Sequence, residues 1–185
     1  HARDSSDIRL AVNFSVAQFY DEDLLSSIAR VLQKYGLPAS KLEVEVTESL
    51  FIRNPEHTKT ILDDMRTMGL RVALDDFGTG YPALSYLKEF EVDTIKLDRS
   101  FISSIGSRDI DLRIVEGIVR LAKSLGLTVV SEGIETPEQD RLLRSIGCDV
   151  AQGYLYGKPM GMEQLKQSIE MLHTPVVLRP ISAVV

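Results

Sequence analysis

Two adjacent aspartates, Asp75 and Asp76, stand between a short apolar run and a glycine-bracketed turn. Residues 71–74 before them are typical of a buried strand. Adjacent strand residues point to opposite faces, so both carboxylates reach one site only where the chain leaves its regular pleat. Neighbouring carboxylates also repel each other unless a cation or a shared proton intervenes. The pair is therefore either a solvated turn or part of a cation site, and the pair alone leaves both open.

Other polar residues occupy the same place, the carboxyl half of a predicted strand. The whole set is Asn13, Glu45, Asp75, Asp76, Lys96, Glu132 and Gln152. In parallel α/β folds the carboxyl ends of the strands converge on the ligand site. Glu45 is the most informative member, because it lies inside an alternating strand where an unpaired charge would be costly. A metal ion or Lys96 would supply its missing partner.

The donor types in this set favour hard divalent cations. Four carboxylates and one amide oxygen are ligands that Mg²⁺ and Mn²⁺ prefer. There are more carboxylates than one ion needs, which favours two ions with Asp75 bridging them. Two such ions ~3.5–4 Å apart stabilise in-line displacement at phosphorus. His57 and His173 are isolated in the sequence and indicate no zinc site.

The elements that must position these residues alternate along the chain. Apolar patterns predict strands over 8–14, 42–47, 71–74, 92–97 and 127–130, and a short strand that reaches residue 152. Helical spacing and capping signals predict helices over 21–35, 55–68, 82–90, around 114–125, 136–147 and around 162–169. Alternating apolar strands and helices predict parallel strands wrapped by helices. The pattern leaves open whether the sheet closes into a barrel. The tail from residue 174 receives no assignment.

Composition bounds the class of protein. The 185 residues, 44% hydrophobic and 26% charged, suit one globular domain. A net charge of -6 argues against a duplex nucleic-acid partner. The single cysteine, Cys148, excludes an internal disulfide and reads as a core residue in a reducing compartment. No run approaches the ~18 apolar residues of a membrane span, and no signal peptide opens the sequence, so we expect a cytoplasmic domain.

Six motifs occur in order and make the chain recognisable. They are Val12-Asn13-Phe14-Ser15, Glu45-Val46-Thr47-Glu48, Asp75-Asp76-Phe77-Gly78-Thr79-Gly80-Tyr81, Ile95-Lys96-Leu97-Asp98, Ser131-Glu132-Gly133-Ile134-Glu135 and Gln152-Gly153-Tyr154. From residue 8 to about 165 the chain resembles the EAL-domain family of bacterial cyclic di-GMP phosphodiesterases. The resemblance implies a modified TIM-type (β/α)8 barrel. It also implies hydrolysis of cyclic di-GMP to linear pGpG with two Mg²⁺ or Mn²⁺ ions.

The resemblance assigns a role to each residue of the set. Asn13, Glu45 and Asp75 correspond to ligands of one metal ion. Asp75, Asp76 and Glu132 correspond to ligands of the other, directly or through water. Lys96 corresponds to the family lysine beside the attacking water, and Glu135 and Gln152 to residues that hold water or substrate. The family has a mobile loop that couples dimerisation to metal binding, and this loop corresponds to Gly78, Thr79, Gly80 and Tyr81. Glu48 corresponds to the residue that anchors the loop.

Two departures from the family pattern qualify these expectations. The Glu-Ala-Leu motif precedes the Asn13 strand in the family and is absent here, together with an arginine that contacts substrate. About six strands then remain, so we expect an incomplete barrel with an exposed sheet edge and weak or no activity in isolation. Pro82 follows the loop where small hydroxyl residues are common, and proline would stiffen it.

The expected organisation is an EAL-type domain over residues 1–173 and a tail over 174–185. Its expected partners are cyclic di-GMP, a second copy of the chain and an upstream sensory or GGDEF-type module, which could anchor the parent protein to a membrane. A different class of function is a receptor or interaction module that binds cyclic di-GMP, or another partner, without cleaving it. A third is an unrelated metal-dependent barrel lyase, which the loop motif after the aspartate pair disfavours.

Overall fold

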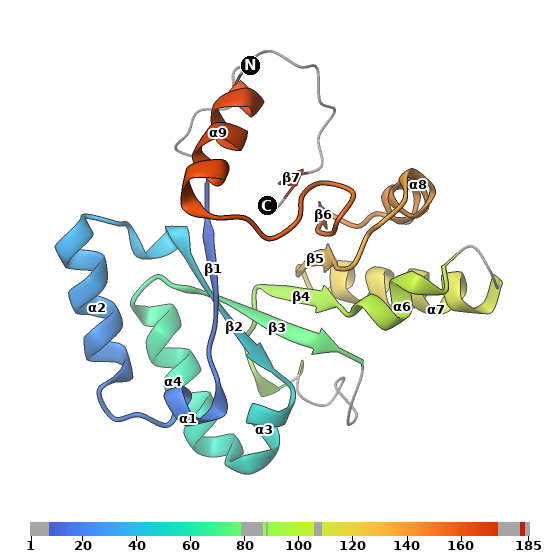
Figure 1. Ribbon diagram of the computed structural model, residues 1–185. Helices are drawn as coiled ribbons and strands as arrows, with labels where there is room; N and C mark the ends of the chain where they lie inside the picture. Colours follow the sequence, from blue (N-terminus) through green and yellow to red (C-terminus); the bar gives the residue numbers. More distant parts are fainter. Residues whose placement is uncertain (1–7, 79–86, 88, 106–108, 174–181, 184–185) are drawn as a thin grey trace.

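The structure, a computed structural model, describes residues 8–78, 87, 89–105, 109–173 and 182–183. Its described strands form one parallel sheet in chain order (Figure 1). They are β1 (Leu10–Asn13), β2 (Leu42–Thr47), β3 (Arg71–Phe77), β4 (Thr94–Leu97), β5 (Thr128–Ser131), β6 (Val150–Ala151) and β7 (Ser182–Ala183). The predicted parallel sheet is confirmed, and β7 falls in the tail that the sequence left unassigned.

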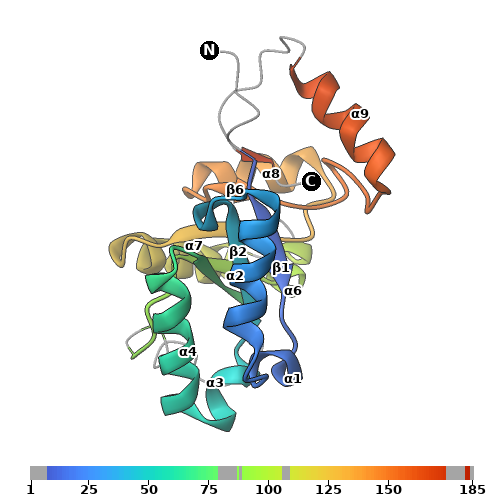
Figure 2. The ribbon, with the colours of Figure 1, turned by 90° about the vertical axis from the view of Figure 1, so that its left-hand side faces the viewer.

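Helices follow the strands, and several of them pack against the sheet. They are α1 (Val16–Phe19), α2 (Leu24–Tyr35), the 3₁₀ helix η2 (Ala39–Lys41), α3 (Ser49–Arg53), α4 (Pro55–Thr67), α6 (Arg99–Ser103), α7 (Asp109–Ser124), α8 (Pro137–Ser145) and α9 (Met162–His173). Figures 1 and 2 show α2 and α4 side by side, and α9 at the opposite end of the molecule from α1 and α3. No helix in the described ranges has the length and apolar content needed to span a membrane.

Local signals in the sequence set the helix ends. Gly36 ends α2 in the left-handed conformation with φ 61°, which glycine adopts without strain. The Asn54 side chain accepts a hydrogen bond from the amide of His57 and caps α4. Thr136 and Gln139 form a capping box at the start of α8. These three predicted boundaries are confirmed.

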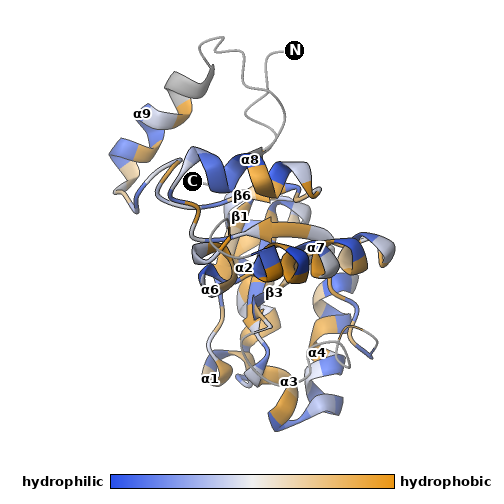
Figure 3. Cartoon of the chain, turned by 90° about the vertical axis from the view of Figure 1, so that its right-hand side faces the viewer, coloured by the Kyte–Doolittle hydropathy of each residue, from blue (hydrophilic) through white to orange (hydrophobic). Residues whose placement is uncertain are grey.

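The core lies between the sheet and its helices. Val44, Val72 and Ile95 from three adjacent strands are fully buried, and Met65 of α4 and Val115 of α7 are buried with them. Figure 3 shows the corresponding division of α7 into an apolar and a polar side. Each buried side chain of this size stabilises the fold by about 1.5–3 kcal/mol.

The sheet does not close among the described residues. β1 and β7 lie at the two ends of the strand order. On β1, Leu10 and Val12 are 51% and 41% exposed, whereas the strand residues of β4 are all buried. The predicted incomplete barrel with an exposed edge at the first strand is therefore confirmed.

Strand β3 corrects one prediction. It continues to Phe77 instead of ending at residue 74, so the aspartate pair lies within the strand. Its register with β4 shifts between Leu74 and Phe77, and Asp76 has φ 55°. The chain thus leaves its regular pleat at the aspartates, as their chemistry required, but it does so through a bulge and then resumes pairing.

Other differences are smaller. The first strand covers residues 10–13 rather than 8–14, and the short helices α1, α3 and α6 were not predicted. Of the helix predicted over 82–90, residues 87 and 89 are helical, while 82–86 and 88 lie outside the described part of the chain.

Candidate metal site at the carboxyl ends of the strands

Parallel pairing brings the predicted site residues to one end of the sheet. Asn13 of β1 lies in register with Glu45 of β2, and Thr47 at the end of β2 lies in register with Asp75 of β3. The amide of Glu132, just after β5, donates to the carbonyl of Leu97 at the end of β4. The strand order therefore converts residues spread over 120 positions of sequence into neighbours.

Lys96 is the centre of this arrangement. Its Nζ lies 2.8 Å from Glu45 Oε1, 3.0 Å from Asp75 Oδ1 and 2.8 Å from Glu132 Oε1. The lysine is only 4% exposed, and Glu45 and Asp75 are also buried. Three carboxylates from three different strand positions thus share one ammonium group. This leaves the site with excess negative charge, which is costly in a buried position without further positive charge.

A second grouping overlaps the first. Asp75, Asp76 and Glu132 each offer a carboxylate oxygen, and these oxygens all lie within 4.8 Å of one another. Asp76 joins the group through the positive φ that accompanies the β3 bulge. Oxygen donors at this mutual spacing fit a hard divalent cation such as Mg²⁺ or Mn²⁺. These three acids therefore form a candidate site for one divalent cation.

Burial among like charges shifts the pKa values of the cluster. Burial, with the nearby charges of Asp75 and Glu45, raises the pKa of Glu132 above its ordinary value, although Lys96 opposes the shift. Burial and the charge of Asp75 likewise raise the pKa of Asp76. Burial alone would lower the pKa of Lys96, but its hydrogen bonds to Glu132 and Glu45 hold that pKa above the ordinary value. Lys96 is therefore charged at neutral pH.

Two predicted residues stand at the rim. Glu135 is exposed, and its Oε1 lies 2.7 Å from Arg99 Nη2. Gln152 is held by its backbone, which accepts from the amide of Ile134 and donates to the carbonyl of Ser131. That pairing fixes Gln152 next to the strand end that carries Glu132. The structure gives neither side chain a hydrogen bond to the acidic cluster.

The predicted loop anchor makes a defined contact. Glu48 is buried, and its Oε1 accepts a hydrogen bond of 2.8 Å from the amide of Gly78. This bond joins the end of β2 to the chain that leaves β3. Thr79, Gly80, Tyr81 and Pro82, named in the sequence predictions, lie outside the described residues.

Sequence reasoning missed a polar layer beneath the cluster. Glu43, buried two residues before Glu45, accepts a 2.7 Å hydrogen bond from Thr94 Oγ1. Arg71 Nε lies 3.5 Å from the same carboxylate oxygen. The signal was present, because alternation along 42–47 places Glu43 and Glu45 on one face.

Comparison with known proteins decides the family. The EAL domain model matches residues 1–159. The chain belongs to the EAL domain family. Its sheet of parallel strands with surrounding helices is therefore part of the TIM-barrel-like fold of EAL domains.

Named relatives of this EAL chain include a bifunctional enzyme. This chain is 40% identical over 164 residues to the "Bifunctional diguanylate cyclase/cyclic di-GMP phosphodiesterase MucR" of Pseudomonas aeruginosa. The alignment covers 89% of this chain and 24% of MucR. The chain spans only 20%, 23% and 24% of the lengths of the first three curated relatives. The chain thus corresponds to about a quarter or less of those proteins.

Two solved EAL structures were determined with the dinucleotide. The PaMucR phosphodiesterase in complex with c-di-GMP matches with a TM-score of 0.82 at 40% identity, over 87% of this chain and 65% of that one. BlrP1 of Klebsiella pneumoniae, in a manganese and cy-diGMP complex, matches with a TM-score of 0.77 at 34% identity, over 82% of this chain and 39% of that one.

Proposed function

We propose that the protein containing this EAL chain hydrolyses cyclic di-GMP to linear pGpG, with Mg²⁺ or Mn²⁺ bound at the Lys96 cluster. The observation that carries the proposal is the meeting of Glu45, Asp75 and Glu132 at one buried ammonium group, with Asp76 beside them. A phosphodiester requires positive charge near its nonbridging oxygens and a positioned water. The names of MucR and of the two dinucleotide complexes support this substrate.

Each residue of the cluster has a proposed part. Asp75, Asp76 and Glu132 would hold one ion, and Asn13 and Glu45, with Asp75 between, would hold a second. The bound ions would neutralise charge on the phosphate and make a coordinated water more acidic. Lys96, charged at neutral pH, orients three of the carboxylates and adds its own positive charge to the site. Glu135 and Gln152 would contact water or substrate at the rim.

The loop that leaves β3 extends the proposal to a dimer. Glu48 ties the backbone at Gly78 to the end of β2, three residues from Glu45. We propose that this hydrogen bond links the metal site to the loop and, through the loop, to a second copy of the chain. The test is light scattering with and without Mn²⁺, comparing the parent protein with its Glu48→Gln variant. The proposal expects a metal-promoted dimer that the variant forms less readily.

The decisive experiment uses the parent protein and chromatographic detection of pGpG. With Mg²⁺ or Mn²⁺ we expect cyclic di-GMP to be consumed and pGpG to form. Asp75→Asn should lower the rate by at least about 100-fold, because it removes a charge from the centre of the cluster. Asp64→Asn is the matched control, since Asp64 is exposed on α4, and it should retain the parent rate.

Binding without turnover would identify a receptor instead. If calorimetry shows that cyclic di-GMP binds equally with and without metal, and no pGpG forms, the hydrolase proposal is rejected. The domain would then be a non-catalytic cyclic di-GMP module.

A further inference from the structure

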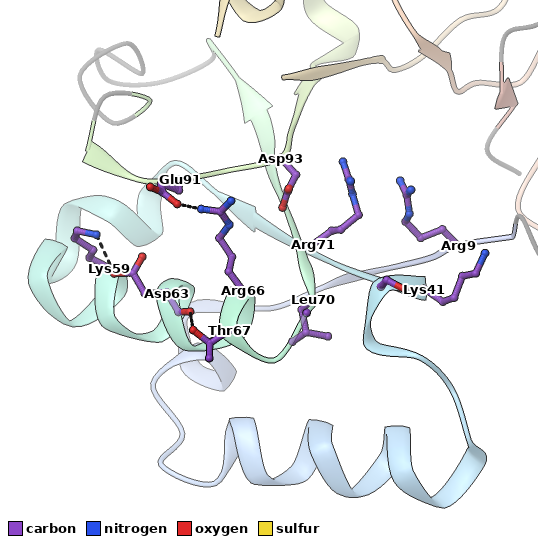
Figure 4. A pocket seen from close by; sticks show the side chains of 12 residues that line it. Arg9, Lys41, Lys59, Asp63, Arg66, Thr67, Leu70, Arg71, Glu91 and Asp93 are labelled. Carbon is purple, nitrogen blue, oxygen red and sulfur yellow. Dashed lines mark hydrogen bonds and ion pairs between the residues drawn. The ribbon is translucent and has the colours of Figure 1, made fainter. Parts of the chain in front are cut away.

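A pocket lies at the opposite, amino ends of the strands that carry the metal site. Its volume is about 880 Å³, and its lining includes Arg9 just before β1, Lys41 just before β2 and Arg71 at the start of β3 (Figure 4). Four residues further along the same three strands stand Asn13, Glu45 and Asp75. At a rise of ~3.3 Å per residue the two sets of Cα atoms are separated by roughly 13 Å. The pocket is therefore separate from the acidic cluster.

The cations on one wall of the pocket are paired with acids. Lys59 Nζ lies 2.8 Å from Asp63 Oδ2, and Arg66 pairs with Glu91. Figure 4 shows both pairs on the α4 side of the pocket. Asp93 is also engaged, because its Oδ2 accepts from the amide of Val72 at 2.9 Å. The two cations of this wall are therefore committed to acids, and the Asp93 carboxylate adds a negative charge that disfavours an anion on this side.

The other wall is cationic. Within the described ranges neither Arg9 nor Lys41 forms an ion pair or a side-chain hydrogen bond. Among the described residues Arg71 forms one ion pair, and it is a long one, because its Nε is 3.5 Å from Glu43 Oε1, an oxygen that already accepts from Thr94 at 2.7 Å. Figure 4 shows the Arg9 and Arg71 side chains extending in the same direction. Three like charges around one hollow repel each other unless an anion lies between them.

We infer that this pocket binds a small phosphate-bearing anion through Arg9, Lys41 and Arg71. Guanidinium groups present paired N–H donors that match phosphate oxygens, and a lysine adds a mobile point charge. The volume lies within the ~300–1,000 Å³ range of small-molecule sites. A chain with net charge -6 has no general surplus of cations, so their gathering here is local. The site requires no metal, and it extends beyond the proposed phosphodiesterase reaction.

The test is calorimetry on the 185-residue chain in EDTA at low salt, with inorganic diphosphate and ATP as separate probes. EDTA keeps metal-held phosphate out of the measurement. We expect diphosphate to bind and its affinity to fall as salt is raised. Tighter binding of ATP would identify a nucleotide, and equal affinity would identify diphosphate as the recognised group. Cyclic di-GMP, with single phosphodiester charges, should bind more weakly here than diphosphate.

Two double variants, each of which removes two positive charges, distinguish binding in the pocket from general electrostatic attraction to the protein. Arg9→Gln with Lys41→Gln should weaken diphosphate binding by about tenfold or more. Lys34→Gln with Arg120→Gln, exposed on α2 and α7, should change it less than about twofold. The single variants Arg9→Gln and Lys41→Gln, each at an exposed or half-exposed position, should each lie between these results.

Three outcomes would overturn the inference: absence of binding, equal weakening by both double variants, or undiminished binding in the Arg9 and Lys41 variant. Asp75→Asn separates this site from the proposed hydrolysis. That variant should lose turnover in the parent protein and retain metal-free diphosphate binding. Loss of diphosphate binding in Asp75→Asn would place the anion at the metal site and reject the pocket.

Discussion

Lys96 Nζ donates a 2.8 Å hydrogen bond to Glu132 Oε1, yet the pKa of Glu132 remains above its ordinary value. Burial is the main cause, and the charges of Asp75 and Glu45 add to it. The cluster also holds more carboxylates than ammonium groups, since Glu45, Asp75 and Glu132 share Lys96. A divalent cation would supply the missing charge, so the cluster combines a permanent ammonium group with a place for an exchangeable ion.

Replacing Lys96 by methionine tests this charge balance. In EDTA, Lys96→Met leaves three acids without their shared partner, and we expect the free energy of unfolding to fall by about 3 kcal/mol. Adding Mn²⁺ should restore more stability in the variant than in the unsubstituted chain, because in the variant the ion does not compete with the ammonium group. Urea unfolding with and without Mn²⁺ measures both effects.

The control for this variant is Lys59→Met, which removes an exposed i,i+4 pair on α4. It should cost less than about 0.5 kcal/mol and show no dependence on Mn²⁺. If Lys96→Met and Lys59→Met lose the same stability, the cluster around Lys96 is not a buried site with an excess of negative charge.

Thr94→Val tests the polar layer beneath the cluster. Thr94 Oγ1 donates the 2.7 Å hydrogen bond that satisfies Glu43, and both residues are buried. Valine keeps the shape but removes the donor, so we expect a loss of roughly 1–3 kcal/mol. Thr60→Val, at an exposed helix position whose hydroxyl bonds to the Glu56 carbonyl, should change stability by less than about 0.5 kcal/mol. Thermal unfolding distinguishes the two, and equal midpoints would contradict the layer's role.

Much of this site followed from sequence because parallel strands have a fixed consequence. Once alternating strands and helices were recognised, polar residues at the carboxyl ends had to converge. The isolated charge of Glu45 required a partner, and Lys96 was one of the two partners that the sequence offered. The structure places them 2.8 Å apart.

The remaining features depend on contacts that no local pattern encodes. The bulge after Leu74 arises from pairing between β3 and β4 and carries Asp76 into the cluster. The pocket at the amino ends of the strands also depends on how the strands pair. Arg9, Lys41 and Arg71 are about 30 residues apart in sequence, and each alone resembles an ordinary cation flanking a strand. Only the order β1-β2-β3 brings them to one hollow.

Gly153→Ala tests the support of Gln152. Gly153 has φ 157°, and a Cβ there would lie 2.2 Å from the Ile134 carbonyl oxygen and 2.3 Å from its nitrogen. Both contacts are with backbone atoms that are already hydrogen-bonded, because the Ile134 amide donates to the Gln152 carbonyl and the Ile134 carbonyl accepts from the Leu155 amide. Neither atom can move away without weakening one of these bonds. We expect a loss of roughly 3 kcal/mol or more in chemical unfolding. Gly117→Ala in α7 meets open space and should instead stabilise the chain by about 0.5–1 kcal/mol. Equal effects would show that Gly153 is not tightly packed.

Cys148 gives a prediction about pH, because burial raises the pKa of its thiol to about 11 from 9.0. Its Sγ also accepts a hydrogen bond from Ser131 Oγ at 3.1 Å. In the unfolded chain the thiol ionises near its ordinary pKa, while in the folded chain it stays neutral until higher pH. Stability from the buried thiol is therefore present below pH 9.0 and is lost as pH rises toward about 11.

The measurement compares the unsubstituted chain, here called the parent, with Cys148→Ala by urea unfolding at about pH 8 and pH 10. Groups common to both chains cancel in the difference, so the comparison isolates the thiol. We expect the stability advantage of the parent over the variant to shrink by about 1 kcal/mol between the two pH values. An advantage that stays constant would mean that Cys148 ionises equally in the folded and unfolded chains, contrary to its burial beside Ser131.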